Sequence, residues 1–183
     1  MDGVSAVLTP AGQAAVPGAL PRGALVLVAV LLAAACRAAP APLAPLLDSP
    51  DELAHEVLDA LAARDRTRLT ALAMTEAEFR ARVWPELPAS RPERNLTAGY
   101  VWNDLTRRSD GSLRGVLSTH GGKRYTLRRL EFAGETTNYG TFSVSRDTEL
   151  IVVDEAGAEH RIRAFGSVLR ADGGVKVFSY VVD

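Results

Sequence analysis

Apolar residues recur at helical spacing immediately after residue 49. Ser49 can cap the first free N–H groups of a helix, and Pro50 suits the first helical position. Glu52 completes a capping box with Ser49. The apolar positions that follow are Leu53, Val57, Leu58 and Leu61. This spacing predicts an amphipathic helix over residues 50–63.

Two further helix starts follow. Asp65 can cap a short second helix, whose apolar residues are Leu69, Leu72 and Ala73. Thr75 and Glu78 form another capping box and begin a third helix. Its apolar side carries Phe79, Val83 and Trp84. Pro85 and Pro88 are predicted to end this helix.

The chain after the third helix has a weaker pattern. Residues 85–99 contain three prolines and are interpreted as a loop. The aromatic stretch 100–102 is predicted to be a short strand or a docked loop. Ser109 or Asp110 is interpreted as the cap of a later helix, whose apolar residues are Leu113, Val116 and Leu117. This helix is predicted to end at His120, before a pair of glycines.

After that glycine pair the hydrophobic period changes from helical to about two residues. The alternation predicts strands over residues 123–132, 140–145, 147–153, 159–169 and 175–182. Asp172-Gly173-Gly174 is a strong hairpin signal between the last two strands. Helices gathered first and antiparallel strands afterwards are typical of an α+β domain, with N-terminal helices packed on one face of a sheet.

This order of elements resembles the NTF2-like, cystatin-like group of folds, in which N-terminal helices lie in the concave face of a curved antiparallel sheet. Residues 75–88 (TEAEFRARVWPELP) and the closing VKVFSYVVD are similar to uncharacterised bacterial lipoproteins. The resemblance covers residues 50–183. It implies a concave pocket, which some members use for small ligands and a few for catalysis. It carries over no catalytic residue, because fold alone does not transfer function.

A separate apolar run precedes the domain. Residues 24–35 (ALVLVAVLLAAA) are twelve uncharged apolar residues, which is fewer than the roughly 20 that a transmembrane helix needs. With Arg22 before it and small residues at its end, the run fits the apolar region of a secretory signal. Because Cys36 follows directly, residues 1–35 resemble a bacterial lipoprotein signal peptide. The resemblance implies that Cys36 is lipidated and becomes the first mature residue.

Three alternatives to lipidation stay open: an uncleaved anchor, plain secretion, and a cytosolic core strand that ends at Cys36. A translation start at Val16 is open as well. The prolines that follow are Pro40, Pro42 and Pro45. They predict an extended tether over residues 36–48, which leads to a single domain over residues 49–183. We expect attachment to a membrane of the bacterial cell envelope through the lipid on Cys36, facing the periplasm or the exterior.

The composition narrows the classes of function. The chain has 183 residues, with 21 Lys+Arg against 22 Asp+Glu and a formal net charge of −1. It therefore lacks the basic footprint of a nucleic-acid-binding protein. A single cysteine excludes an intramolecular disulfide framework and a multi-cysteine metal site. We expect no nucleic-acid partner, no metal and no cofactor, and the oligomeric state stays open.

The titratable residues match no catalytic motif. His120 is interpreted as a helix-terminal residue, His160 as a sheet-face residue and His55 as a surface residue. Carboxylates on or beside the strands are interpreted as a solvated sheet face. These are Glu131, Glu135, Asp147 and Glu149. We therefore predict no catalytic residue.

The aromatic residues are the strongest binding candidates, because Tyr and Trp combine a large apolar area with one polar group. Trp84, Tyr100 and Trp102 flank the proline-rich loop, so we predict them at the mouth of a ligand pocket. Arg91 and Arg94, within that loop, are predicted to supply polar contacts. Core packing is the alternative role for the aromatic side chains.

Two classes of function follow from the sequence. The first is a non-enzymatic, lipid-anchored envelope domain that binds a protein partner or a small ligand, or that serves as an accessory subunit. The alternative is a pocket enzyme of the same fold, a hydrolase or isomerase that uses a carboxylate from the sheet. An enzyme should hold an ionisable residue with a perturbed pKa deep in a concave cavity. A binding domain should show a filled cavity or an exposed aromatic patch.

Overall fold

The computed structural model describes residues 43–44 and 46–182. The predicted signal peptide and Cys36 lie outside the described residues. The described residues all belong to one compact unit. Within the described chain, no helix is both long enough and apolar enough to cross a membrane.

The first three predicted helices are confirmed. Helix α2 (Pro50–Ala62) begins where Ser49 Oγ accepts a hydrogen bond from the Glu52 backbone N–H at 3.1 Å. Helix α3 (Arg66–Ala71) is capped by Asp65, as predicted. The capping box of Thr75 and Glu78 starts α4 (Glu76–Glu78), which continues as the π-helix η1 (Phe79–Val83) and the 3₁₀-helix η2 (Trp84–Glu86).

The interpretation of residues 100–102 as a strand or docked loop is wrong. After the 3₁₀ turns η3 (Pro88–Ser90) and η4 (Pro92–Arg94), helix α5 runs from Ala98 to His120. Its cap is Thr97, whose side chain accepts a hydrogen bond from the Tyr100 N–H at 3.2 Å. The proposed cap at Ser109 or Asp110 is therefore also wrong, because both residues lie in the interior of α5. The predicted end at His120 is confirmed.

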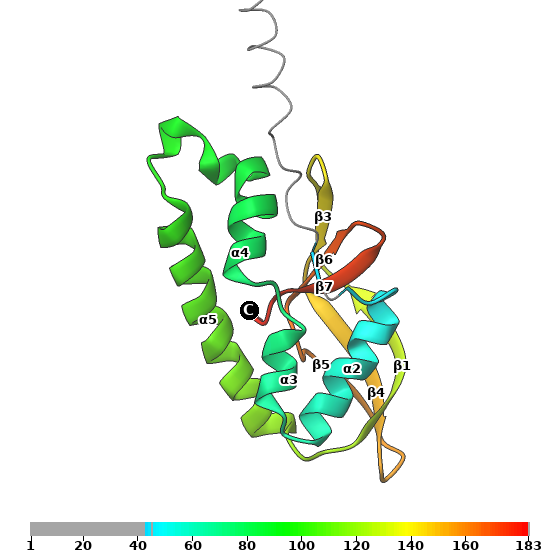
Figure 1. Cartoon of the computed structure of the whole chain (residues 1–183). Helices are drawn as coiled ribbons and strands as arrows, with labels where there is room; N and C mark the ends of the chain where they lie inside the picture. The colour runs from blue at the N-terminus through cyan, green and yellow to red at the C-terminus, as the bar shows by residue number, and fades with distance from the viewer. Residues whose placement is uncertain (1–42, 45, 183) are drawn as a thin grey trace, which may run out of the picture. The chain divides into compact units, whose positions relative to one another are not determined.

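The strands form two antiparallel sheets, so the α+β class is confirmed but the expectation of a single sheet is wrong. The first sheet has the order β1-β4-β5, formed by β1 (Tyr125–Phe132), β4 (Thr148–Asp154) and β5 (Glu159–Ile162). The second has the order β2-β3-β6-β7, formed by β2 (Thr136–Asn138), β3 (Phe142–Ser145), β6 (Ser167–Ala171) and β7 (Gly174–Ser179). Figure 1 shows α2 beside β1 and α5 along the other flank of the domain.

The predicted strand over residues 159–169 is broken into β5 and β6, which belong to different sheets. The break depends on Gly166, whose N–H donates to Ser179 O at 3.0 Å and whose carbonyl accepts from Thr148 N at 3.0 Å. A Cβ at this position would lie 1.6 Å from Val181 O. Such a close approach of two backbones requires glycine.

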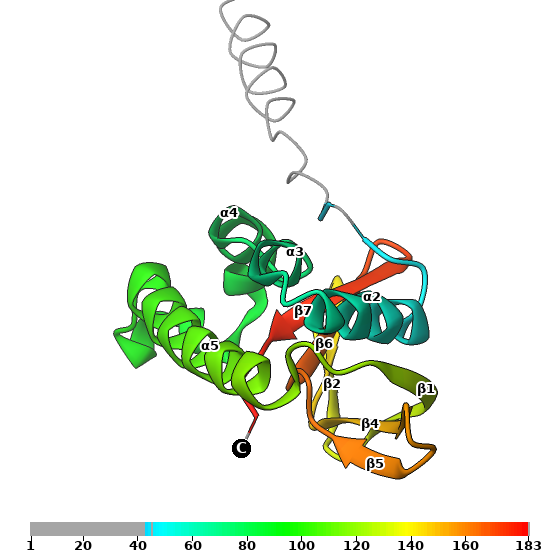
Figure 2. The same ribbon diagram turned by 90° about the horizontal axis from the view of Figure 1, so that it is seen from below.

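The apolar side chains form two clusters. The first joins α2 and the end of α5 to β4 and β7, and its fully buried members include Leu53, Val57, Leu61, Leu150, Phe165 and Val177. The second surrounds Phe79 and Val83, and contains Met74, Phe142, Val144 and Leu169. The view from below in Figure 2 shows α2 lying over the region between the two sheets.

Residues before Ser49 also contact the domain. Leu47 pairs with Val175 at the edge of β7, with N–O distances of 3.1 and 2.8 Å. Leu43 is 4% exposed, and Ala44 O accepts a hydrogen bond from Lys176 Nζ at 3.1 Å. These residues belong to the predicted tether over residues 36–48, so the contacts of the packed domain begin before residue 49.

Candidate functional site

A polar pocket lies where the end of α5 meets the start of β1 and the β4–β5 turn. Its volume is about 620 Å³. Four of its side chains form one cluster, which we call the His–Tyr–Asp cluster: His120, Tyr125, Asp154 and His160. The pocket is also lined by Lys123, Arg124 and Arg161.

The chain reaches the pocket through a glycine turn after α5. Gly122 has a φ of +82°, a conformation that side chains rarely adopt. Its N–H donates to Leu61 O at 2.9 Å, which fastens the start of β1 to the end of α2. A Cβ at Gly122 would lie 2.9 Å from Arg64 Nε. This turn places His120, at the end of α5, next to Tyr125, at the start of β1.

The β4–β5 turn positions the other half of the cluster. Asp154 Oδ1 accepts hydrogen bonds from the Ala156 and Ala158 N–H groups, both at 2.9 Å. This leaves Oδ2 free to contact His160 Nε2 at 2.6 Å. His160 pairs with Val152 across the antiparallel ladder, so the strand register sets the side of the sheet on which it lies.

Tyr125 joins the two halves. Its hydroxyl lies 3.1 Å from His120 Nδ1. Its ring packs edge-on against His120 at a centroid distance of 5.8 Å and against His160 at 6.3 Å. Two histidines that are far apart in the sequence therefore contact one tyrosine.

The cluster holds its members in distinct protonation states. Burial lowers the pKa of His120, and the nearby charge of Lys123 lowers it further. Burial also raises the pKa of Tyr125, with Asp154 adding to the effect. The hydrogen bond to His160 is the main reason that the pKa of Asp154 lies below its usual range. At neutral pH the pocket therefore presents a neutral His120, a protonated Tyr125 and an ionised Asp154.

Two of the three cations in the pocket are unpaired within the described chain. Lys123 and Arg124 are exposed and form no ion pair there. Arg161 differs, because it donates to both Glu131 and Glu149. The pocket thus combines unpaired positive charge with neutral hydrogen-bonding groups.

One carboxylate departs from the expectation of a solvated sheet face. The Glu149 side chain is only 11% exposed and forms ion pairs with Arg161 and Arg163, the latter at 3.0 Å. Hydrogen bonds from these arginines hold the pKa of Glu149 below its usual range. Glu149 is therefore a structural ion-pair partner. Glu131, Glu135 and Asp147 are partly or fully exposed, as expected.

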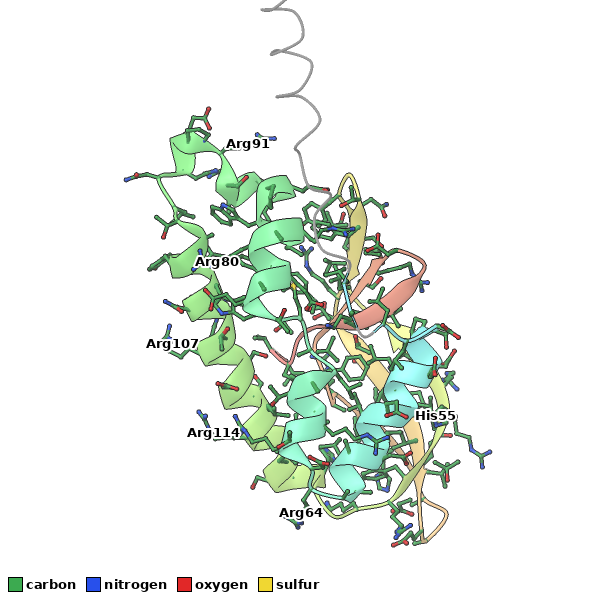
Figure 3. All side chains as sticks on the ribbon, viewed as in Figure 1. His55, Arg64, Arg80, Arg91, Arg107 and Arg114 are labelled. Carbon is green, nitrogen blue, oxygen red and sulfur yellow. The ribbon has the colours of Figure 1, made fainter. Side chains whose placement is uncertain are left out.

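The residues predicted to bind a ligand are separated in the structure. Trp84 and Trp102 both pack against Phe79, at ring centroid distances of 6.1 and 5.3 Å. Tyr100 is 65% exposed on α5. Arg91 and Arg94 are exposed in the turns that precede α5, and Figure 3 places Arg91 at the far end of the domain from the C-terminal end of α5. The structure therefore brings the two tryptophans together, but not Tyr100 or the arginines.

The sequence interpretation missed Tyr125 and Asp154 and treated the histidines separately. A signal for half of the cluster was present, because a hairpin turn at Glu155–Gly157 implies that residues 154 and 160 lie close together. His55 lies elsewhere, on the exposed side of α2 (Figure 3). Among the described residues, no group of three or more His, Cys, Asp and Glu side chains is arranged to hold a metal ion.

The cluster can bind an anionic group through Lys123 and Arg124, and Asp154 orients the imidazole of His160. Neutral His120 and Tyr125 can each donate or accept one further hydrogen bond. No family model, curated protein or solved structure matches this chain, so the chemistry is argued from these side chains alone.

Proposed function

We propose that this protein is a lipid-anchored envelope protein whose domain binds a small anionic ligand in the polar pocket. The observation that carries the proposal is the convergence of His120, Tyr125 and His160 beside two unpaired cations, Lys123 and Arg124. A carboxylate or phosphate group suits this combination, because cations neutralise its charge while imidazole and phenol groups supply directed hydrogen bonds.

The pocket lies away from the first described residues of the chain. The described chain enters at the edge of β7, where Leu47 pairs with Val175. The pocket lies instead at the β4–β5 turn and the end of α5, which Figure 1 shows at the lower end of the domain. The pocket therefore does not involve the residues by which the described chain enters the domain. The NTF2-like, cystatin-like relationship is part of this proposal, and helices that precede antiparallel strands support it.

Binding is tested by isothermal titration with inorganic phosphate and with citrate. We expect replacement of both Lys123 and Arg124 by Ala to weaken binding by tenfold or more, since each removes one charge contact. The matched control replaces Arg91 and Arg94 by Ala, which removes the same charge at the other end of α5. Equal affinity of the two double variants, or a loss confined to the control, would contradict the proposed site.

The anchor has its own test. Cys36→Ala should release the protein from membranes and abolish fatty-acid labelling, because the thiol that would carry the lipid is gone. Unchanged membrane fractionation of this variant would refute lipidation. This outcome is independent of ligand binding, which is measured separately by titration.

The second candidate function is a pocket hydrolase or isomerase. The contact of 2.6 Å between His160 Nε2 and Asp154 Oδ2 favours it, because a carboxylate that orients a histidine is a common arrangement for a general base. Asp154 is also the last residue of β4, and is thus a carboxylate from the sheet. Hydrolysis of p-nitrophenyl phosphate and p-nitrophenyl acetate tests this function. Turnover that persists in Asp154→Asn and His160→Ala would exclude these residues as its catalysts.

A further inference from the structure

Five exposed residues form one line along the outward side of helix α5, which we call the α5 stripe: Tyr100, Asn103, Arg107, Arg114 and Ser118. Their spacing brings each of them back to the same side of a helix with about 3.6 residues per turn. None of the five is acidic. The opposite side of α5 packs on the domain through the buried Leu113 and Val116. The α5 stripe therefore faces solvent along most of the helix.

Arginines around the α5 stripe outnumber the carboxylates. Asp104 pairs with both Arg107 and Arg108, at 2.7 and 3.1 Å, so one carboxylate serves two guanidinium groups. Three further arginines are exposed and form no ion pair within the described chain: Arg91, Arg94 and Arg114.

Two other acidic residues occur in this stretch. Asp110 pairs with Arg66 of α3 at 3.1 Å, and Glu93 is exposed in the turn before α5. With the Asp110–Arg66 pair set aside, residues 91–120 carry five arginines against two carboxylates. The surface formed by α5 and the turns before it is therefore positive at neutral pH.

Helix α2 carries the opposite charge. It contains no lysine or arginine but has four carboxylates, those of Asp51, Glu52, Glu56 and Asp59. Only Glu56 among them forms an ion pair within the described chain, with Arg68 of α3. Figure 3 shows Arg107 and Arg114 on one flank of the domain and His55, on α2, on the other. Although the whole chain has a net charge of −1, an anionic surface would therefore orient the domain with α5 toward it.

The start of α5 adds apolar side chains to this positive surface. Leu96 is 40% exposed and Tyr100 is 65% exposed, and among the described residues these are the large hydrophobic residues classed as exposed. Two protruding side chains do not make the core of a protein interface, which commonly covers about 800 Å² on each partner. They suit the headgroup layer of a bilayer, where an amphipathic tyrosine ring is favoured.

We propose that the α5 stripe binds an anionic phospholipid bilayer, with α5 lying along the surface. Arg107 and Arg114 contact lipid phosphates, to which a guanidinium group can donate paired hydrogen bonds. Leu96 and Tyr100 enter the headgroup layer. The contact uses neither Cys36 nor the polar pocket, so it is independent of the proposed lipid anchor and of the proposed anion site.

The test places a solvent-sensitive fluorophore on the α5 stripe. Asn103→Cys is labelled in the full chain carrying Cys36→Ala, so the introduced cysteine is the only one. Vesicles of equal parts phosphatidylglycerol and phosphatidylcholine are compared with vesicles of phosphatidylcholine alone. We expect a blue shift of the emission with the anionic vesicles only. The same label at His55→Cys, on the exposed side of α2, should not shift with either.

Replacing both Arg107 and Arg114 by Ala should raise the vesicle concentration at half-maximal shift by at least about tenfold, because each basic side chain near an anionic bilayer contributes about fivefold. Alanine and arginine are both good helix formers, so α5 is retained. Replacement of the same two residues by Lys keeps the charge and should preserve most of the binding. The matched control replaces Arg128 and Arg170 by Ala. Both are exposed arginines outside α5 without an ion pair in the described chain, and their loss should change little.

Four results would overturn the proposal. The first is no shift at Asn103→Cys with anionic vesicles, which is expected if the α5 stripe docks an acidic protein instead. The second is an equal shift with neutral vesicles, or an equal shift of the label at His55→Cys. The third is equal binding by the two double alanine variants. The fourth is a loss confined to the Lys123→Ala, Arg124→Ala variant, since the polar pocket would then bind the headgroup.

Discussion

Replacing Lys176 by Met tests whether a buried ion pair holds the helices to the second sheet. Lys176 is 1% exposed and Glu78 is 9% exposed. Lys176 Nζ lies 2.8 and 3.0 Å from the two Glu78 carboxylate oxygens. Methionine fills a similar volume without the charge, so the main effect is to leave Glu78 ionised and buried. Breaking a buried pair in this way typically costs about 3–5 kcal/mol of folding free energy.

The remaining contacts of Glu78 determine how much folding free energy Lys176→Met should lose within the range of about 3–5 kcal/mol. After the substitution, its carboxylate still accepts hydrogen bonds from the Thr75 N–H at 2.8 Å and from the Thr75 hydroxyl at 2.9 Å. It also accepts from the Ala44 N–H at 2.9 Å. These bonds compensate part of the lost attraction, so we expect about 3 kcal/mol at neutral pH, the lower end of the range. Ala44 loses the bond from Lys176 to its carbonyl as well.

The loss of folding free energy in Lys176→Met should depend on pH. Burial alone would raise the pKa of Glu78, but the hydrogen bonds from Lys176 and Thr75 outweigh burial and lower it. A lowered pKa stabilises the fold above the unfolded value, about 4.3, and this contribution disappears as the pH falls through the folded value. Without Lys176 the pKa of Glu78 should rise, and protonation should then relieve the buried charge. The difference in free energy of unfolding between the unmodified protein and Lys176→Met should therefore shrink as the pH falls from 7 to 4.

Urea unfolding followed by tryptophan fluorescence measures the loss of folding free energy, and repeating it at pH 7 and pH 4 measures how that loss depends on pH. The control is Lys123→Met, which removes an exposed lysine and should change the free energy of unfolding little. The double variant Glu78→Gln, Lys176→Met should recover part of the stability, because the uncompensated charge is gone. A loss below about 1 kcal/mol, or one that is equal at pH 7 and pH 4, would refute the interpretation of this pair.

Three further predictions concern single residues. Gly166→Ala should destabilise the domain by at least about 2 kcal/mol in thermal unfolding, because its Cβ would meet Val181 O at 1.6 Å. Tyr180→Phe removes the buried hydrogen bond to Leu69 O, and the same measurement should show a loss of about 1–2 kcal/mol. His120 should titrate by NMR with a midpoint below 6.5, since burial lowers its pKa; its contribution to stability is therefore lost as the pH falls below 6.5. An unchanged unfolding temperature in either variant, or a midpoint at or above 6.5, would contradict the corresponding prediction.

The starts of α2, α3 and α4 were predictable because helix caps are local. The side chains of Ser49, Asp65 and Thr75 each bond a backbone N–H three residues later, and this geometry needs no distant partner. The start of α5 was not predictable in the same way. Ser109 and Asp110 have the composition of a cap, yet their polar groups are satisfied from other elements, by the Tyr180 N–H and by Arg66.

The strands, like the helices, were predictable only where neighbouring residues in the sequence specify them. Alternation in the sequence located β1 and β3, in which more buried and less buried residues alternate over at least part of the strand. It also located β4 and β7, although the residues of these two strands are buried almost throughout. It did not separate β5 from β6, since residues 163–166 include the buried Ala164 and Phe165 and continue the apolar pattern. The division into two sheets depends on the backbone approach at Gly166, which involves a residue 15 positions later, Val181.

The sequence by itself determined the local features of this protein: the caps, the hydrophobic periods and the glycine end of α5. These depend on residues a few positions apart. Only the tertiary structure decided the His–Tyr–Asp cluster and the burial of Glu149. Each of these depends on strand register or helix packing that joins residues distant in the chain, and hydrophobic pattern specifies the existence of an element but not its neighbours.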